Sequence, residues 1–238
     1  MSEPVVAIVV AAGSGVRLGA SVPKAMVPLK GVPLLRRSAE ALVAGGVTHL
    51  VVVVPDDQRR AFGVALLGCP VPWTMATGGA RRQDSVAAGL AVAGEWAPPH
   101  RVVLVHDAAR PLVPPEAVAR VIAAVRGGAP AVVPVVAVAD TIRAVDENGS
   151  RIVDRSGLRA VQTPQGFDPD VLVTAHRALA CAGVVVTDDA AACERLGHPV
   201  SLVEGSTDAL KITTSIDLVV AGAVLDDRER RATGSPQP

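Results

Sequence analysis

The chain has 238 residues, half of them hydrophobic, and its 23 lysines and arginines balance its 23 aspartates and glutamates. This length accommodates one sizeable α/β domain with a large core. The zero net charge gives no general attraction to nucleic acid or to an anionic membrane, and aromatic residues, at 2 %, are too few for a base-stacking surface.

Cysteine usage and hydropathy bear on the cellular compartment. Cys69, Cys181 and Cys193 are odd in number and scattered, which favours a reducing environment over a disulfide framework. No apolar stretch reaches the ~20 residues of a membrane-spanning helix, and the first residues lack the basic start and long apolar centre of a signal peptide. We therefore expect a cytoplasmic protein.

The first strand leads directly into a glycine-rich turn. Val5–Val10 is a continuous apolar run, typical of a buried parallel strand. Gly13 and Gly15 let backbone N–H groups approach phosphate oxygens closely, and Arg17 and Lys24 add two cations. Gly13, Gly15 and Gly19 form a G-x-G-x-x-x-G pattern, which is one residue longer than the dinucleotide-binding fingerprint. The Gly-Lys-Ser/Thr ending of a Walker loop is also missing. The glycines alone also fit an ordinary βα turn, but with the cations they predict a polyphosphate pocket.

Strands and helices alternate along the chain, with one interruption after residue 137. Buried strands are expected at His49–Val54 and 101–105, and a further strand is expected at 200–203. The segments 72–77 and Ala131–Ala137 alternate with the helices. Helices are expected from Pro33 to the stop at Gly45, over 57–67 and 84–93, from Pro114 onward, and over 168–181, 188–196 and 215–224. Such alternation predicts an α/β fold with a doubly wound, mostly parallel sheet, in a single domain over 1–225.

The alternation breaks after residue 137. Two short, half-polar runs, 141–145 and 151–154, flank an Asn-Gly pair, which is a strong hairpin signal. A hairpin with so few apolar side chains cannot form a core of its own. We expect a projecting β-hairpin arm at about 138–157 that packs on a second subunit, although a plain surface hairpin is the alternative.

The end of the chain is expected to be simple. In the helix over 215–224, the spacing of Ile216, Val219 and Val220 predicts that these three side chains face the core. Residues 226–238 are polar and end in Gly-Ser-Pro-Gln-Pro, which predicts a flexible tail.

Two polar turns follow predicted strands. Asp107 and Arg110 come at the end of the run 101–105, and a carboxylate there is suited to Mg²⁺, although a loop aspartate can also be a turn former. Gly79 opens a turn into a helix, where its backbone and the Ser85 hydroxyl could contact a planar base. A capped helix start is the alternative at this second turn.

Four further polar residues in the second half of the chain suit a small phosphate-bearing molecule. Thr141 and Thr163 supply hydroxyls, and Arg155 and Lys211 supply cations.

Taken in order, these motifs resemble the 2-C-methyl-D-erythritol 4-phosphate cytidylyltransferase (IspD) family of nucleotidyltransferases over roughly residues 5–225. The matching motifs are A-A-G-S-G-V-R with V-P-K, G-G-A-R-R-Q-D-S-V, V-H-D-A-A-R-P and Q-T-P-Q. The resemblance implies a Rossmann-like fold, Mg²⁺ dependence and a homodimer whose hairpin arms clasp the neighbouring subunit. It implies transfer of the cytidylyl group of CTP to methylerythritol 4-phosphate in non-mevalonate isoprenoid biosynthesis, with pyrophosphate released.

The resemblance also assigns roles to single residues. Arg17, Lys24, Arg155 and Lys211 would be catalytic, and Asp107 would hold the metal. Nucleotide contacts would come from Ala11, Ala12, Gly13, Gly15, Gly79 and Ser85. Contacts to the sugar phosphate would come from Arg110, Thr141, Arg155, Thr163 and Lys211. Ala80 stands where some members carry Asp, which leaves base selectivity open. A cytidylyltransferase for ribitol 5-phosphate and a non-catalytic nucleotide-binding regulator remain the alternatives.

Overall fold

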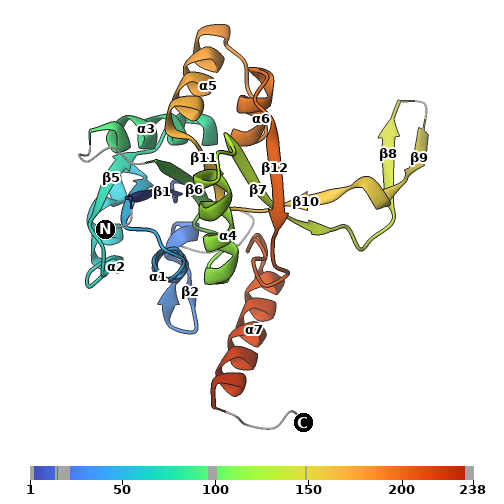
Figure 1. Ribbon diagram of the computed structural model, residues 1–238. Helices are drawn as coiled ribbons and strands as arrows, with labels where there is room; N and C mark the ends of the chain where they lie inside the picture. Colours follow the sequence, from blue (N-terminus) through green and yellow to red (C-terminus); the bar gives the residue numbers. More distant parts are fainter. Residues whose placement is uncertain (1–2, 14, 16–21, 96–100, 148, 234–238) are drawn as a thin grey trace.

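A central β-sheet organises the molecule (Figure 1). The computed structural model describes residues 3–13, 15, 22–95, 101–147 and 149–233. Within them an eight-stranded sheet runs in the order β10-β7-β11-β6-β1-β4-β5, with β12 also paired to β7. The strands are β1 (Val5–Val10), β4 (His49–Val54), β5 (Trp73–Thr77), β6 (Val102–Asp107), β7 (Ala131–Ala137), β10 (Arg159–Val161), β11 (Gln165–Phe167) and β12 (Val200–Glu204).

The predicted parallel pairing is confirmed for the centre of the sheet. Strand β1 pairs in parallel with β4 on one side and with β6 on the other, and β5 extends the sheet beyond β4. Strands β1, β4 and β6 are buried on both faces, as their continuous valine-rich sequences require. Strands β10 and β11 are antiparallel to their neighbours and were not predicted, because three residues carry too little pattern.

Helices cover both faces of the sheet, which confirms the doubly wound α/β class. Helices α1, α2 and α4 pack on one face, and α3, α5 and α6 pack on the other. Their bounds are α1 (Leu34–Ala44), α2 (Arg59–Ala65), α3 (Arg82–Gly94), α4 (Pro115–Arg126), α5 (Pro169–Ala182), α6 (Asp189–Arg195) and α7 (Ser215–Thr233). Short 3₁₀ turns occur at Lys24–Met26, Asp56–Gln58 and Arg155–Gly157.

Local sequence sets the ends of these helices. At the start of α5 the Asp168 carboxylate accepts hydrogen bonds from the backbone N–H groups of Asp170 and Val171. Pro169 follows at the first helical position, where its missing N–H costs nothing. Gly183 ends the helix in the left-handed conformation, with φ of 64°. These signals explain why this helix could be read from the sequence.

The predicted hairpin is present as an arm that extends from the body of the molecule (Figure 1). Strands β8 (Ile142–Asp146) and β9 (Gly149–Val153) pair only with each other among the described residues. Val145 and Ile152 on this arm are 78 % and 65 % exposed. A two-stranded hairpin is marginal in water unless something packs on it, so the arm has an apolar surface available for a partner.

Helix α7 corrects two expectations about the end of the chain. It continues to Thr233 instead of fraying from Asp226, because Arg228 reaches back to the Asp208 carboxylate and the Leu112 carbonyl oxygen. Its inward face is formed by Leu218, Ala221, Val224 and Leu225. The predicted inward face of Ile216, Val219 and Val220 is exposed. Both faces have helical spacing, so periodicity alone chose the wrong one.

The start of α7 is closed by Asp217. Its carboxylate accepts hydrogen bonds from the backbone N–H groups of Thr213 and Thr214, both at 2.7 Å, and from both threonine hydroxyls. Burial would raise the pKa of this carboxyl, but the four hydrogen bonds lower it to about 2.

We predict that Asp217→Ala lowers the free energy of unfolding by about 1 kcal/mol at neutral pH, because the backbone N–H groups of Thr213 and Thr214, which lead into α7, lose their acceptor. The pKa is depressed in the folded state, so the contribution is complete above the ordinary value of 3.8 and disappears as the pH falls to about 2. Urea titrations of both proteins between pH 7 and pH 2 measure this difference. A difference that stays constant over this range would contradict the assignment.

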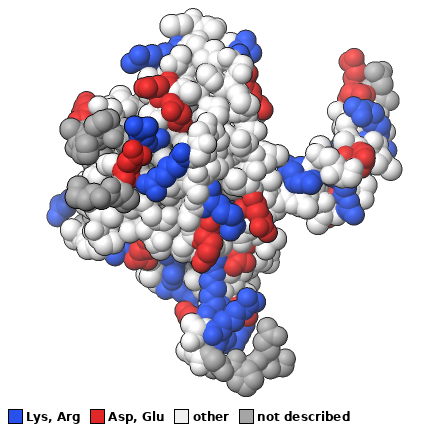
Figure 2. Space-filling model, viewed as in Figure 1, with Lys and Arg blue, Asp and Glu red and all other residues white. Residues whose placement is uncertain are grey.

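Charge is distributed without a dominant sign. On the face shown in Figure 2, basic and acidic side chains are intermixed over the body of the molecule. Positive charge for a phosphate ligand must therefore be concentrated in a particular site.

None of the described helices combines the length and the apolar character needed to cross a membrane.

Candidate active site

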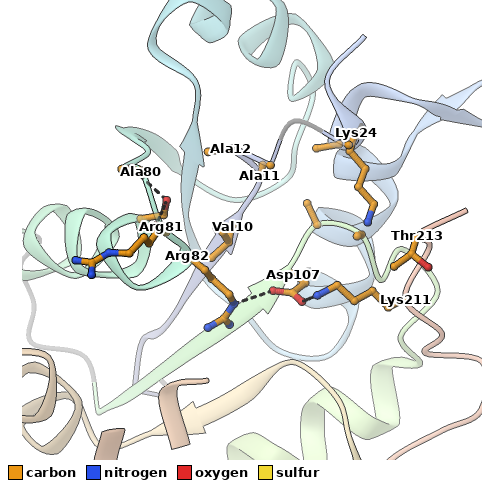
Figure 3. Close-up of a pocket in the computed structure, with 17 residues that line it drawn as sticks. Val10, Ala11, Ala12, Lys24, Ala80, Arg81, Arg82, Asp107, Lys211 and Thr213 are labelled. Carbon is orange, nitrogen blue, oxygen red and sulfur yellow. Dashed lines mark hydrogen bonds and ion pairs between the residues drawn. The ribbon is translucent and has the colours of Figure 1, made fainter. Parts of the chain in front are cut away.

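A cavity of about 400 Å³ lies where β1 and β6 end (Figure 3). The register pairs Val10 with Asp107, so the last residues of the two strands stand side by side at the carboxyl edge of the sheet. The chain leaves β1 toward β4 on one side and returns to β6 on the other. Open α/β sheets bind ligands at such a switch point, and the volume suits a nucleotide-sized molecule.

Most of the sequence-predicted site residues line this one cavity. They are Ala11, Ala12, Gly13, Gly15, Lys24, Gly79, Ser85, Asp107 and Lys211. Segments far apart in the chain thus converge as the motifs predict. Two of the three lysines in the whole chain are among them. Arg17 lies outside the described residues.

Two glycines allow the loops around the cavity to approach each other. A Cβ atom on Gly15, whose φ is 66°, would stand 2.5 Å from the Lys24 Cβ. A Cβ atom on Gly78 would stand 2.4 Å from the Ala12 Cβ. Both glycines are needed because their neighbours occupy the space of a side chain, and the first of them sets where Lys24 enters the cavity.

The turn into α3 has the capped start that was the alternative for this segment. The Asp84 carboxylate accepts a hydrogen bond from the Arg81 N–H, and the two side chains pair at 2.8 Å. The Ser85 hydroxyl accepts from the Gly79 N–H at 3.2 Å and donates to the Arg81 carbonyl oxygen at 3.1 Å. Ser85 therefore also shapes the turn that lines the cavity.

Asp107 stands between two cations (Figure 3). The Lys211 Nζ donates to its Oδ2 at 2.7 Å, and the Arg82 Nε donates to its Oδ1 at 3.2 Å. Burial alone would raise the pKa of this carboxyl, but the two positive charges hold the pKa well below its usual range. Asp107 is therefore an ionised carboxylate in a largely buried position.

The arginine continues this network into the core. Its Nη1 lies 2.7 Å from the Asp189 Oδ2, and the His176 Nε2 lies 3.0 Å from the Asp189 Oδ1. Burial would lower the pKa of Arg82, but Asp189 and Asp107 raise the pKa above its ordinary value. Arg82 lines the cavity and was missed in the sequence. The only available signal was its place in the glycine turn, because both carboxylates that it contacts are distant in the chain.

Two predicted acceptor-site residues lie behind the cavity wall. Arg110 donates to the carbonyl oxygens of Ala209, at 2.7 Å, and Val161, at 3.3 Å. Its pKa is lowered by burial. The buried Thr163 hydroxyl accepts from the Asp107 N–H at 3.1 Å. Neither residue is among those that line the cavity, so in this structure they support the chain segments that carry Lys211 and Asp107.

The remaining two predicted residues belong to the arm. Thr141 immediately precedes β8, and Arg155 follows β9, where its guanidinium contacts the Ala139 carbonyl oxygen. Both are exposed, and neither lines the cavity of its own chain.

The described residues contain no group of three or more His, Cys, Asp or Glu side chains that could hold a metal alone. The cavity offers one ionised carboxylate, Asp107, beside two lysines. This donor set fits a hard cation such as Mg²⁺, which usually takes one or two protein carboxylates and completes its shell with phosphate oxygens and water.

Comparisons with known proteins show the family of this chain. The family model described as "IspD: 2-C-methyl-D-erythritol 4-phosphate cytidylyltransferase" matches residues 5–227. The protein of that name from Saccharopolyspora erythraea is 54 % identical, and the alignment covers 93 % of this chain and 99 % of the relative. The corresponding structure from Thermus thermophilus has 35 % identity and a TM-score of 0.74, over 95 % of this chain and 100 % of that one. The chain belongs to the 2-C-methyl-D-erythritol 4-phosphate cytidylyltransferase family.

Proposed function

We propose that this chain transfers the cytidylyl group of CTP to 2-C-methyl-D-erythritol 4-phosphate, a step of non-mevalonate isoprenoid biosynthesis. The products are pyrophosphate and 4-diphosphocytidyl-2-C-methyl-D-erythritol. Family membership over nearly the whole chain supports the reaction. The observation that carries it is the cavity itself, where Lys24, Lys211 and Asp107 meet beside two glycine turns.

The nucleophile is an oxygen of the acceptor phosphate. It attacks the α-phosphorus of CTP, and the bond from that phosphorus to the β-phosphate oxygen breaks. A phosphate monoester is mostly ionised at neutral pH, since its second pKa is near 6, so no general base is needed. The barrier is the approach of one anion to another, and catalysis consists of positioning and charge stabilisation.

The cations divide this work between the two substrates. We assign Lys24, with Arg17, to the triphosphate, because Lys24 packs against Gly15 of the glycine turn that we assign to the nucleotide. Lys211 is assigned to the acceptor phosphate and is released from Asp107 for that role. Asp107 would hold Mg²⁺, and a bound divalent cation would neutralise phosphate charge. Ala11, Ala12, Gly13, Gly15, Gly79 and Ser85 are assigned to the nucleotide.

Pyrophosphate release from CTP tests the proposal. The purified protein is incubated with CTP and Mg²⁺, and with methylerythritol 4-phosphate or ribitol 5-phosphate in separate reactions. We expect release with methylerythritol phosphate and little with ribitol phosphate. The opposite preference would identify the ribitol enzyme, and CTP binding without release in either reaction would identify a non-catalytic regulator.

A cytoplasmic location fits the reduced, scattered cysteines.

We also propose a homodimer in which each arm reaches the cavity of the other subunit. The exposed Val145 and Ile152 support an arm that packs on a partner. Arg155 and Thr141 do not line the cavity of their own chain, whereas the reaction needs charge at the acceptor phosphate. An arm supplied by the partner resolves both points. Arg110 and Thr163 would then act at the acceptor side by fixing the wall of the site.

A mixing experiment distinguishes this arrangement from a self-contained site. Arg155→Ala and Lys24→Ala are each expected to be nearly inactive as pure proteins. Unfolded together and refolded at equal amounts, they should recover roughly a quarter of the wild-type rate, because half of the dimers are mixed and each mixed dimer has one intact site. Without recovery in a mixture that contains mixed dimers, Arg155 would act within its own chain or not at all.

A further inference from the structure

Five charged or ionisable side chains form a continuous line from the core to the cavity. The line runs from His176 through Asp189, Arg82 and Asp107 to Lys211. Its inner end is buried, since Asp189 is 2 % exposed and His176 6 %. Its outer end lies at the cavity, where Lys211 pairs with Asp107, the carboxylate that we assign to the metal. Arg82 is the link between the two ends.

We propose that Arg82 is a positioning residue for Asp107. Its guanidinium donates to the Asp107 Oδ1. The Oδ2 accepts from Lys211 and would be available to a divalent metal ion once Lys211 moves to the acceptor phosphate. This inference rests on the proposed function, and it adds a residue that acts through Asp107 without touching the reacting atoms.

The geometry requires an arginine at this position. Arg82 contacts Asp107 through Nε and Asp189 through Nη1, so one rigid guanidinium bridges two carboxylates. A planar fork can make both bonds at fixed angles, whereas the single ammonium of lysine cannot reproduce them. The bridge connects helix α3 to strand β6 and helix α6.

The far end of the bridge is held in place. Asp189 lies in the first turn of α6, and His176 of α5 donates to its second oxygen. The neighbouring Asp188 caps the same helix through the Ala191 N–H at 2.9 Å. Because Asp189 is buried and fixed on both oxygens, it anchors the guanidinium, and the guanidinium in turn orients Asp107.

A competing interpretation is that Arg82 binds the triphosphate directly, since it also lines the cavity. The two interpretations differ in what Asp189 does. A direct contact needs the positive charge of Arg82 but not its remote anchor. A positioning role needs the anchor as much as the arginine, so loss of either one should have the same effect.

The test compares Arg82→Gln, Arg82→Lys, Asp189→Asn and the double variant Arg82→Gln with Asp189→Asn. We expect kcat to fall ~10- to 100-fold in each single variant. The KM for CTP, and the affinity for Mn²⁺·CTP measured by calorimetry, should change less than ~3-fold, and the double variant should be no worse than the worse single one. Arg36→Gln, which removes another arginine–carboxylate pair outside the cavity, serves as the matched control.

Three results would overturn the inference. One is Arg82→Lys near the wild-type rate while Arg82→Gln binds Mn²⁺·CTP weakly. Another is losses that multiply in the double variant. The third is a folded Asp189→Asn with unchanged kcat. If Asp189→Asn does not fold, the lysine and glutamine variants still decide, and a wild-type protein that releases no pyrophosphate would refute the proposed function instead.

Discussion

Lys24→Ala is expected to remain folded while its rate of pyrophosphate release falls by ~10²–10⁵. The side chain enters the cavity from a 3₁₀ turn packed against Gly15. At the start of the reaction a triphosphate and a phosphate monoester must approach each other, and a fixed ammonium lowers the cost of that approach most in the transition state. Removing the charge therefore acts on kcat more than on stability.

Lys30 provides the matched control for this variant. It pairs with Asp226 and Glu229 at the surface, outside the cavity. Surface ion pairs contribute little to stability, so Lys30→Ala should keep the wild-type rate and nearly the same melting temperature. Turnover by Lys24→Ala within a few-fold of wild type, in a protein that melts normally, would remove Lys24 from the mechanism.

The central strands of the sheet could be predicted from the sequence because each of them carries two signals, an apolar run and the turn residues at its ends. Val5–Val10 and His49–Val54 are continuous apolar runs, and turn residues bound them. Burial on both faces requires such runs, so the pattern and the structure have the same physical cause. The partner of each strand was not in the pattern, and the short antiparallel β11 shows the limit, since three residues can belong to a turn equally well.

The cavity was predictable wherever a motif ended a strand. Asp107 ends β6 and the first glycine turn follows β1, so the fold class alone brings them together. Arg82 was not predictable, because its function depends on Asp189, a residue brought beside it by the packing of α6 on the sheet. The same limit applies to Thr141 and Arg155, since no pattern within one chain says which cavity an arm serves.

Asp107→Asn is expected to lower the rate by ~10²–10³ and to weaken the dependence on Mg²⁺. Asparagine has nearly the same shape, and its side-chain oxygen can still accept from one cation. The backbone N–H of residue 107 keeps its bond to Thr163. The variant thus removes charge while it preserves the local fold, and Glu40→Gln, which removes a carboxylate from a surface pair, is the matched control.

Charge also predicts an opposite effect of Asp107→Asn on nucleotide binding. In the wild-type protein the Asp107 carboxylate repels the triphosphate and engages Lys211 and Arg82. Without this carboxylate, less of the positive charge of Lys211 and Arg82 is neutralised in the cavity. CTP binding in the absence of a divalent cation should therefore tighten several-fold. Calorimetry with CTP in EDTA measures this affinity. Tighter metal-free binding together with slower turnover would show that Asp107 acts through its charge on the metal-bound complex. Weaker binding with a lowered melting temperature would mean that it acts mainly as part of the structure.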